Sequence, residues 1–152
     1  MKYISLTQDK FAIIDDSDFE WLSQWKWCFD KKGYAVRWQW LKKEKRYIFI
    51  LMHRLILNTP DNLETDHRNG NGLDNQRNNL RICTRQQNLQ NRRKILGTTS
   101  KYKGVYWNKN NQKWMVRVKK IYMGYFDSEK VAALAYNQKA VELFGEFARL
   151  NV

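Results

Sequence analysis

Acidic residues are absent from a long central stretch of this chain. No Asp or Glu lies between Asp74 and Asp127, whereas thirteen Lys and Arg residues fall in that interval. The full 152 residues carry a formal net charge of +13 at pH 7. A surface built only for solubility normally intersperses both signs of charge, so this acid-free stretch indicates a surface that binds nucleic acid.

Cysteine and long apolar segments are scarce as well. Cys28 and Cys83 are the only cysteines, and they show no paired spacing. This argues against a zinc finger and against a disulfide framework, and it suits a reducing intracellular compartment. The first ten residues lack the hydrophobic core of a signal peptide, and no membrane span is visible. We therefore expect a cytoplasmic protein without a membrane partner.

Aromatic residues, in contrast, are abundant. They make up 14% of the chain, with seven Trp and eight Tyr, and hydrophobic residues reach 43%. This composition predicts folded modules, and the length allows one ordinary domain or a few small ones. Amphipathic aromatic residues suit either a small core or stacking platforms for DNA, and we favour the core. The residues concerned are Trp21, Trp25, Trp27, Trp38 and Trp40.

Residues 1–60 are expected to form a small β-rich module. Apolar residues on both sides of a polar turn predict a hairpin from residues 3–6 and 11–14. Acidic and capping residues predict a short helix start over residues 15–22. Further strands are predicted over residues 26–29, 34–41 and 46–51.

A strand, a loop, a second strand and a helix are predicted next. The first strand ends in Asp66 and His67, and it is followed by a run of Asn and Gly residues, which form turns. The second strand is predicted over residues 80–84. Thr84 and Gln87 have the spacing of a capping box, so a helix should begin there.

This stretch resembles the HNH nuclease motif, in the variant whose third position is Asn rather than His. The resemblance implies that residues 61–93 form a ββα-metal unit in which Asp66 and Asn88 hold one divalent cation against a scissile phosphate. It also implies that His67 takes a proton from the attacking water and that Asn79 braces the loop. Enzymes of this kind cut DNA and leave 5′-phosphate and 3′-hydroxyl ends.

The chemistry of phosphodiester hydrolysis fits these residue types. The unperturbed pKa of His suits taking a proton from water near neutral pH. One carboxylate and one amide oxygen suit Mg²⁺ or Mn²⁺ better than Zn²⁺, and two protein ligands leave positions for water and phosphate. Neighbours on a regular strand point to opposite faces, however. The strand must therefore bend or end where Asp66 and His67 address one phosphate.

Two further features of this region bear on the site. On the predicted helix, Arg85, Asn88 and Arg92 lie at i, i+3 and i+7, hence on one face, and the two guanidinium groups would grip phosphate. His53 is the other histidine, either a second base or a structural residue. A Met-His-Arg-Leu segment commonly precedes the Asp-His pair in related phage-type nucleases, and we read residues 52–57 as a helix packing under the site.

Residues 94–100 are expected to form a basic linker, and residues 101–152 carry a second resemblance. Three strands and an Ala-rich helix look like the plant ethylene-response-factor (APETALA-two) type of DNA-binding domain, which also occurs fused to phage HNH nucleases. The resemblance implies a three-stranded antiparallel sheet that lies in the major groove and is backed by one helix. The strands are predicted over 101–107, 113–119 and 121–127, and the helix over 128–144 with an apolar stripe of Ala132, Ala133, Ala135, Tyr136, Ala140 and Leu143.

The family's DNA-contacting positions fall on the sheet of this predicted domain. Strand alternation places Arg117 and Lys119 on one face, opposite Val116 and Val118. This face would contact phosphates, with Arg117 reading guanine, or it is simply solvated. The matching positions are Lys103, Tyr106, Arg117, Lys119 and Tyr122.

We therefore expect an α+β protein similar to phage or mobile-intron HNH homing endonucleases. It would hydrolyse double-stranded DNA in a phage or its bacterial host, nicking as a monomer or cutting both strands as a homodimer. Two other classes stay open: a DNA-binding regulator with an inactive nuclease fold, and an RNA-binding protein. Plasmid cleavage with Mg²⁺ would distinguish the nuclease from an inactive regulator. Competition between duplex DNA and RNA would distinguish it from an RNA-binding protein.

Overall fold

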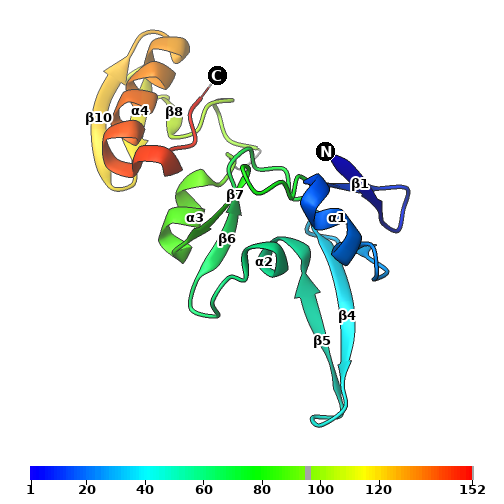
Figure 1. Cartoon of the computed structure of the whole chain (residues 1–152). Helices are drawn as coiled ribbons and strands as arrows, with labels where there is room; N and C mark the ends of the chain where they lie inside the picture. Colours follow the sequence, from blue (N-terminus) through cyan, green and yellow to red (C-terminus); the bar gives the residue numbers. More distant parts are fainter. Residues whose placement is uncertain (95–96, 152) are drawn as a thin grey trace. The chain divides into compact units, whose positions relative to one another are not determined.

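The computed structural model describes residues 1–94 and 97–151, and it confirms the α+β class. The chain divides into two compact units, residues 1–88 and residues 89–152. Small antiparallel sheets and short helices follow one another along the chain (Figure 1). The division into four segments with boundaries near residues 60, 93 and 100 stays a prediction. Within the described residues, no helix is both long enough and apolar enough to cross a membrane.

The first unit opens with the predicted hairpin. Strand β1 (Lys2–Ser5) pairs antiparallel with β2 (Phe11–Ile14), within one residue of the expected bounds. Helix α1 (Asp16–Leu22) follows, and its first turn carries the acidic side chains that favour a helix N-terminus. The hairpin and α1 contribute Ile4, Leu6, Ala12, Ile14 and Leu22 to the core of this unit.

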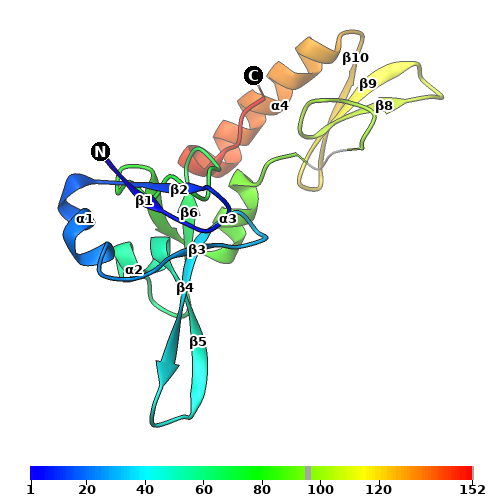
Figure 2. The same ribbon diagram turned by 90° about the vertical axis from the view of Figure 1, so that its right-hand side faces the viewer.

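A second sheet has the order β3-β4-β5. It consists of β3 (Cys28–Phe29), β4 (Ala35–Leu41) and β5 (Arg46–Leu51). The β4–β5 hairpin is much longer than β3, and its far end extends beyond the other elements of the first unit in both views (Figures 1 and 2).

The prediction that the five tryptophans of residues 1–60 lie in the core is only partly right. Trp27 is buried, and its indole nitrogen donates a hydrogen bond to the Leu22 carbonyl oxygen at 2.9 Å. Trp21 and Trp25 pack against the same core. Trp38 and Trp40 are exposed, because they lie on the part of the β4–β5 hairpin that no other described element of the first unit covers.

The segment that carries the motif folds as the sequence predicts. Helix α2 (Met52–Leu57) leads to strand β6 (Glu64–His67), which pairs antiparallel with β7 (Leu80–Cys83). Helix α3 (Arg85–Asn91) follows. The capping box is complete. The backbone N–H of Gln87 donates to Thr84 Oγ1 at 3.2 Å, and the backbone N–H of Thr84 donates to Gln87 Oε1 at 2.8 Å.

The N-terminal elements hold the loop between β6 and β7. The Ile13 amide donates to the Leu73 carbonyl, and the Asn75 amide donates to the Ile13 carbonyl, both at 2.8 Å. Arg77 binds the buried Asp18 carboxylate through two nitrogens at 2.8 and 2.7 Å. These contacts fix a loop rich in Asn and Gly that would otherwise have many conformations.

The second unit contains a three-stranded antiparallel sheet in the order β10-β9-β8. Its strands are β8 (Val105–Asn108), β9 (Lys113–Val118) and β10 (Ile121–Phe126). Helix α4 (Glu129–Phe144) packs against this sheet and is followed by the short helix η1 (Gly145–Phe147).

The core of the second unit lies between the sheet and α4. Most of the predicted apolar stripe is buried there, but Leu143 is exposed and the next residue, Phe144, packs against the core instead. Gly104 has a φ of +73°, and a Cβ at this position would lie 2.2 Å from the Tyr136 ring, so only glycine fits. The buried residues from both layers include Val105, Val116, Val118, Ala132, Ala133, Tyr136 and Ala140.

Candidate functional site

Strand β6 sends chemically different side chains to its two faces. Glu64 and Asp66 share one face with Cys83 and Arg81, which lie directly opposite them on β7. His67 points to the other face. The strand ends at His67 as expected, but its pairing with β7 stays regular up to that residue, so no bend brings the Asp66 and His67 side chains onto one face.

The Asp66 carboxylate is buried and paired with Arg81. Both Arg81 Nε and a terminal guanidinium nitrogen donate to Asp66 Oδ2, at 2.8 and 2.6 Å. Such a charge-assisted pair compensates for the removal of the carboxylate from water and fixes its orientation. Our sequence interpretation missed Arg81, although the register of the two strands places it opposite Asp66.

Asn88 reaches the same face from helix α3. Its amide nitrogen donates to Glu64 Oε2 at 2.6 Å, so its carbonyl oxygen is the atom with which it would bind a cation. Burial raises the pKa of the Cys83 thiol to about 11, and the negative charges of Asp66 and Glu64 add to this shift. The structure therefore brings Asp66 and Asn88 to one face of the β6–β7 pair, together with a second carboxylate.

The donor atoms on this face fit a hard divalent cation. They are carboxylate and amide oxygens, which Mg²⁺ and Mn²⁺ prefer, whereas the thiol of Cys83 stays protonated and is a poor ligand. In residues 1–94 and 97–151, no three side chains of His, Cys, Asp or Glu converge as a metal site. A cation would thus depend on Asp66, with Asn88 and Glu64 as its oxygen neighbours.

The opposite face of β6 surrounds His67 with uncharged rings. Its imidazole lies 4.9 Å from the His53 ring and 5.8 Å from the Tyr34 ring, centroid to centroid. Its Nε2 atom lies 3.4 Å from Asn75 Oδ1. Burial lowers the pKa of His67, while Asn75, Asp66 and Asp74 oppose that shift. The imidazole is therefore neutral near pH 7, as a general base must be, and only 5% exposed.

The His53 ring lies against the His67 ring, which agrees with the prediction that residues 52–57 form a helix packing under the site. Burial lowers the pKa of His53 to about 3, and the nearby charges of His67 and Arg54 act in the same direction. Within the described part of the chain, no hydrogen-bond partner reaches His53 Nδ1. The sequence leaves His53 open as a second base or a structural residue, and it contains no local pattern that shows Tyr34 next to His67.

Asn79 lies inside the loop that joins β6 to β7. Its side-chain oxygen accepts a hydrogen bond from the backbone N–H of Asn69 at 3.0 Å. Its side-chain nitrogen donates to Asn69 Oδ1 at 3.2 Å and to the Asp74 carbonyl at 2.7 Å. Asn79 thus connects the two ends of the loop and holds its shape next to His67.

The two arginines expected on one face of α3 are not placed alike. Arg85 is exposed in the first turn, three residues before Asn88. The helix ends at Asn91, so Arg92 lies beyond it and does not continue that face. The predicted placement of Arg92 on the helical face of Arg85 and Asn88 is therefore wrong, whereas phosphate contacts by Arg85 and Arg92 stay a prediction.

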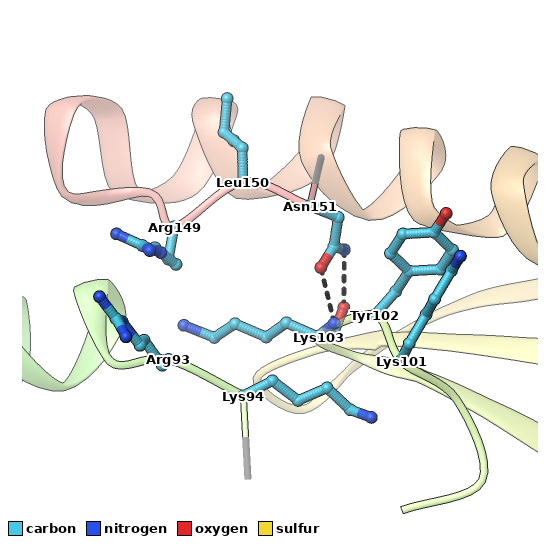
Figure 3. A pocket seen from close by; sticks show the side chains of 8 residues that line it. All are labelled: Arg93, Lys94, Lys101, Tyr102, Lys103, Arg149, Leu150 and Asn151. Carbon is cyan, nitrogen blue, oxygen red and sulfur yellow. Dashed lines mark hydrogen bonds between the residues drawn. The ribbon is translucent and has the colours of Figure 1, made fainter. Parts of the chain in front are cut away.

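Lys103 lies before strand β8 rather than on the sheet. Its ammonium donates to the carbonyl oxygens of Gln90 at 2.6 Å and Arg92 at 2.8 Å. Burial lowers the pKa of Lys103 to about 8, and the charge of Arg149 adds to this effect. Figure 3 shows its side chain extending into a basic pocket of about 310 Å³, lined by Arg93, Lys94, Lys101, Tyr102, Lys103, Arg149, Leu150 and Asn151.

The remaining predicted DNA contacts lie around the sheet. Arg117 and Tyr122 are opposite each other on β9 and β10, and Tyr106 shares their exposed face. Lys119 does not, because it lies in a turn with a φ of +55° and its ammonium is 5.0 Å from the Phe144 ring of α4. A hollow of about 570 Å³ at this end of the sheet is lined by Lys103, Gly104, Tyr106, Met115, Arg117, Lys119 and Tyr136.

Comparison with known proteins identifies the class of protein that this fold and site define. Residues 58–90 match a family model described as HNH endonuclease. The chain is also 35% identical over 149 residues, which is 93% of this chain and 74% of the relative, to an uncharacterized HNH endonuclease of Acanthamoeba polyphaga mimivirus. No solved structure matches it significantly. The chain belongs to the HNH endonuclease family.

Proposed function

We propose that this chain hydrolyses phosphodiester bonds in double-stranded DNA, with His67 as general base and Asp66 and Asn88 as ligands of one Mg²⁺ or Mn²⁺. Family membership supports the nuclease activity. One observation carries the assignment of roles: Asp66 and Asn88 share a face of the β6–β7 pair, and the neutral His67 is the next residue along β6.

Each residue contributes a separate function to this proposal. The bound cation would neutralise the scissile phosphate and the leaving oxygen. Arg81 orients the Asp66 carboxylate through two hydrogen bonds. The neutral His67 takes a proton from water, and Asn75 orients its ring. Asn79 holds the loop that begins after His67. The products would carry 5′-phosphate and 3′-hydroxyl ends.

The second unit is proposed to target the enzyme to DNA. Its three-stranded sheet backed by one helix agrees with the expected ethylene-response-factor type of domain. Arg117, Tyr106 and Tyr122 form an exposed face that suits phosphate and base contacts. We further propose that the protein acts inside a phage-infected bacterial cell as a homing endonuclease, nicking as a monomer or cutting both strands as a homodimer.

A plasmid assay tests the proposed activity. Supercoiled plasmid is incubated with the full-length protein and Mg²⁺ or Mn²⁺, and relaxed and linear products are quantified. Cleavage should appear with either cation and vanish with a chelator. The His67→Ala variant should bind the same DNA but cut it far more slowly. Full cleavage in the presence of chelator would exclude the proposed metal site.

A second candidate function is a DNA-binding regulator with an inactive nuclease fold. One observation favours it: His67 is almost fully buried, and the Asp66 carboxylate is already bound by Arg81. In that case the chain would bind duplex DNA and cut no plasmid at any concentration of Mg²⁺ or Mn²⁺. A preference for RNA over duplex DNA in competition would contradict both functions.

A further inference from the structure

The β4–β5 hairpin exposes a ladder of four aromatic side chains on one face. Trp38 lies opposite Phe49 and Trp40 lies opposite Tyr47, with ring centroids 5.0 and 4.9 Å apart. Their exposed fractions are 60%, 43%, 46% and 63%, in the order named. Contiguous apolar surface of this kind usually marks an interaction site in a soluble protein. We define these four residues as the aromatic ladder.

The tip of the same hairpin is basic. Lys42, Lys43 and Lys45 are exposed, and no acidic side chain in the described part of the chain pairs with them. Glu44 is the only acid at the tip, and it is already bound to Arg46 at 2.5 Å. The tip therefore presents three available ammonium groups next to the aromatic ladder.

We propose that the β4–β5 hairpin is a DNA-binding arm that enters a groove of the duplex. The aromatic ladder would contact sugars and base edges, and the tip lysines would contact phosphates. A two-stranded β-ribbon fits the major groove, which is about 12 Å wide. The choice of DNA rests on the proposed nuclease function and on charge. A second copy of a chain with a net charge of +13 would repel this basic tip, whereas a polyanion complements it.

The arm is joined directly to the helix that packs against the candidate active site. Leu51 is both the last residue of β5 and the residue that caps α2, so the strand runs directly into the helix. The next residue but one, His53, contacts the His67 ring. Six residues of β5 span roughly 20 Å, which corresponds to about six base pairs at about 3.4 Å each. A ribbon in a groove is inclined to the DNA axis, so this length is an upper limit, and the tip of the arm would contact DNA within about six base pairs of the cleaved phosphate.

Binding of variants tests the arm. Anisotropy of a fluorescein-labelled 30-base-pair duplex is measured with the full-length protein at several salt concentrations. Trp38→Ala and Trp40→Ala should each weaken binding about tenfold, the scale of aromatic contacts with nucleotides. Changing Lys42, Lys43 and Lys45 together to Ala should reduce the slope of log affinity against log salt by about 0.9 for each phosphate that the variant no longer neutralises.

Gln39→Ala provides the matched control, because Gln39 is exposed on the opposite face of β4. It should leave affinity and salt slope unchanged. Unchanged binding in the tryptophan and lysine variants would overturn the proposal. So would the loss of a dimer in sedimentation experiments on Trp38→Ala without a change in DNA affinity, because the ladder would then bind a second copy of the chain.

A footprint of the unmodified protein tests the arm without a variant that has to fold. Hydroxyl-radical protection is mapped on a duplex in which the nick position is known. Protection of the groove on one side of the nick, within about six base pairs, supports the arm, and full accessibility of that groove on both sides contradicts it. Failure of the arm is distinguishable from failure of the nuclease proposal, because the arm variants should still cut plasmid at saturating protein, whereas a chain without nuclease activity cuts none.

Discussion

The two faces of strand β6 handle buried ionisable groups in opposite ways. On one face, the carboxylate of Asp66 keeps a cationic partner in Arg81, and Glu64 accepts a hydrogen bond from Asn88. On the other face, His67 and His53 lie among rings, and burial lowers the pKa of both. One face therefore holds carboxylates that can attract a cation, while the other holds uncharged imidazole rings.

This difference shows how four consecutive residues can supply two kinds of chemistry. Strand alternation separates Asp66 from His67 although they are neighbours in the sequence. A cation held by Asp66 would lie on the other face of the strand from the imidazole nitrogens, which are themselves good metal ligands. The regular strand thus separates the ligand from the base, although both are proposed to act on one phosphate.

We expect the largest loss of cleavage from a substitution on the face of β6 that carries Asp66. Asp66→Ala should abolish cleavage, because it removes both a cation ligand and a negative charge. It should also lower the free energy of unfolding by about 3–5 kcal/mol, since Arg81 would be left buried without its partner. Plasmid cleavage and urea unfolding of the variant measure the two losses.

A double variant separates stability from catalysis on this face. Asp66→Ala combined with Arg81→Met removes the whole buried pair, and such replacements are often neutral for stability. The free energy of unfolding should return toward the wild-type value, while cleavage should stay absent. A double variant that cuts plasmid would show that Asp66 holds no cation.

His67→Ala should give the next largest effect, on the uncharged face. We expect cleavage to slow by about 10²- to 10⁴-fold, the usual contribution of a general base. DNA affinity should stay nearly constant, because the side chain is buried and provides no charge to phosphates. Single-turnover cleavage and anisotropy measure the two quantities. A wild-type rate would instead assign the base to His53 or another group.

Most local structure in this molecule could be predicted from the sequence. Strand β6 ends at His67, where the turn-forming run of Asn and Gly residues begins, and α3 begins at its capping box. The grouping of Asp66 and Asn88 follows from the motif. The end of β6 and the start of α3 depend on residues close in sequence, so a local pattern contains that information.

The rest depends on contacts between distant residues. Tyr34 and His53 meet His67 only because the residue before β4 and helix α2 pack against the β6–β7 pair. Trp38 and Trp40 look like core residues by composition, yet the hairpin carries them into solvent. Lys119 breaks the strand alternation because a left-handed turn redirects its side chain toward Phe144.

We expect the stability of the fold to depend on pH because of His53, which packs against His67. The folded pKa of His53 is about 3, below its ordinary value of 6.5, so the unfolded chain binds the proton more readily between these values. Stability should therefore fall as pH drops below about 6.5, by about 2 kcal/mol at pH 5. Urea unfolding at pH 7 and pH 5 should show this loss, and His53→Gln should remove the His53 share. An equal loss in His53→Gln would attribute it to other groups.

The smallest effects are expected from substitutions of Asn88 and Cys83, which both lie on the Asp66 face of β6. Asn88→Ala should raise the Mg²⁺ concentration needed for half-maximal cleavage by at least about tenfold, because even outer-shell partners typically contribute 10- to 100-fold to metal affinity. Cys83→Ala is the matched control, since the thiol is close to the same carboxylates but has a pKa of about 11 and stays protonated. Its Mg²⁺ requirement should equal that of the wild type. Mg²⁺ titrations of plasmid cleavage for the two variants decide the matter: equal shifts would mean that both substitutions merely disturb packing, whereas a shift confined to Asn88→Ala would show that cation binding depends on the Asn88 amide, either as a ligand or through its hydrogen bond to Glu64.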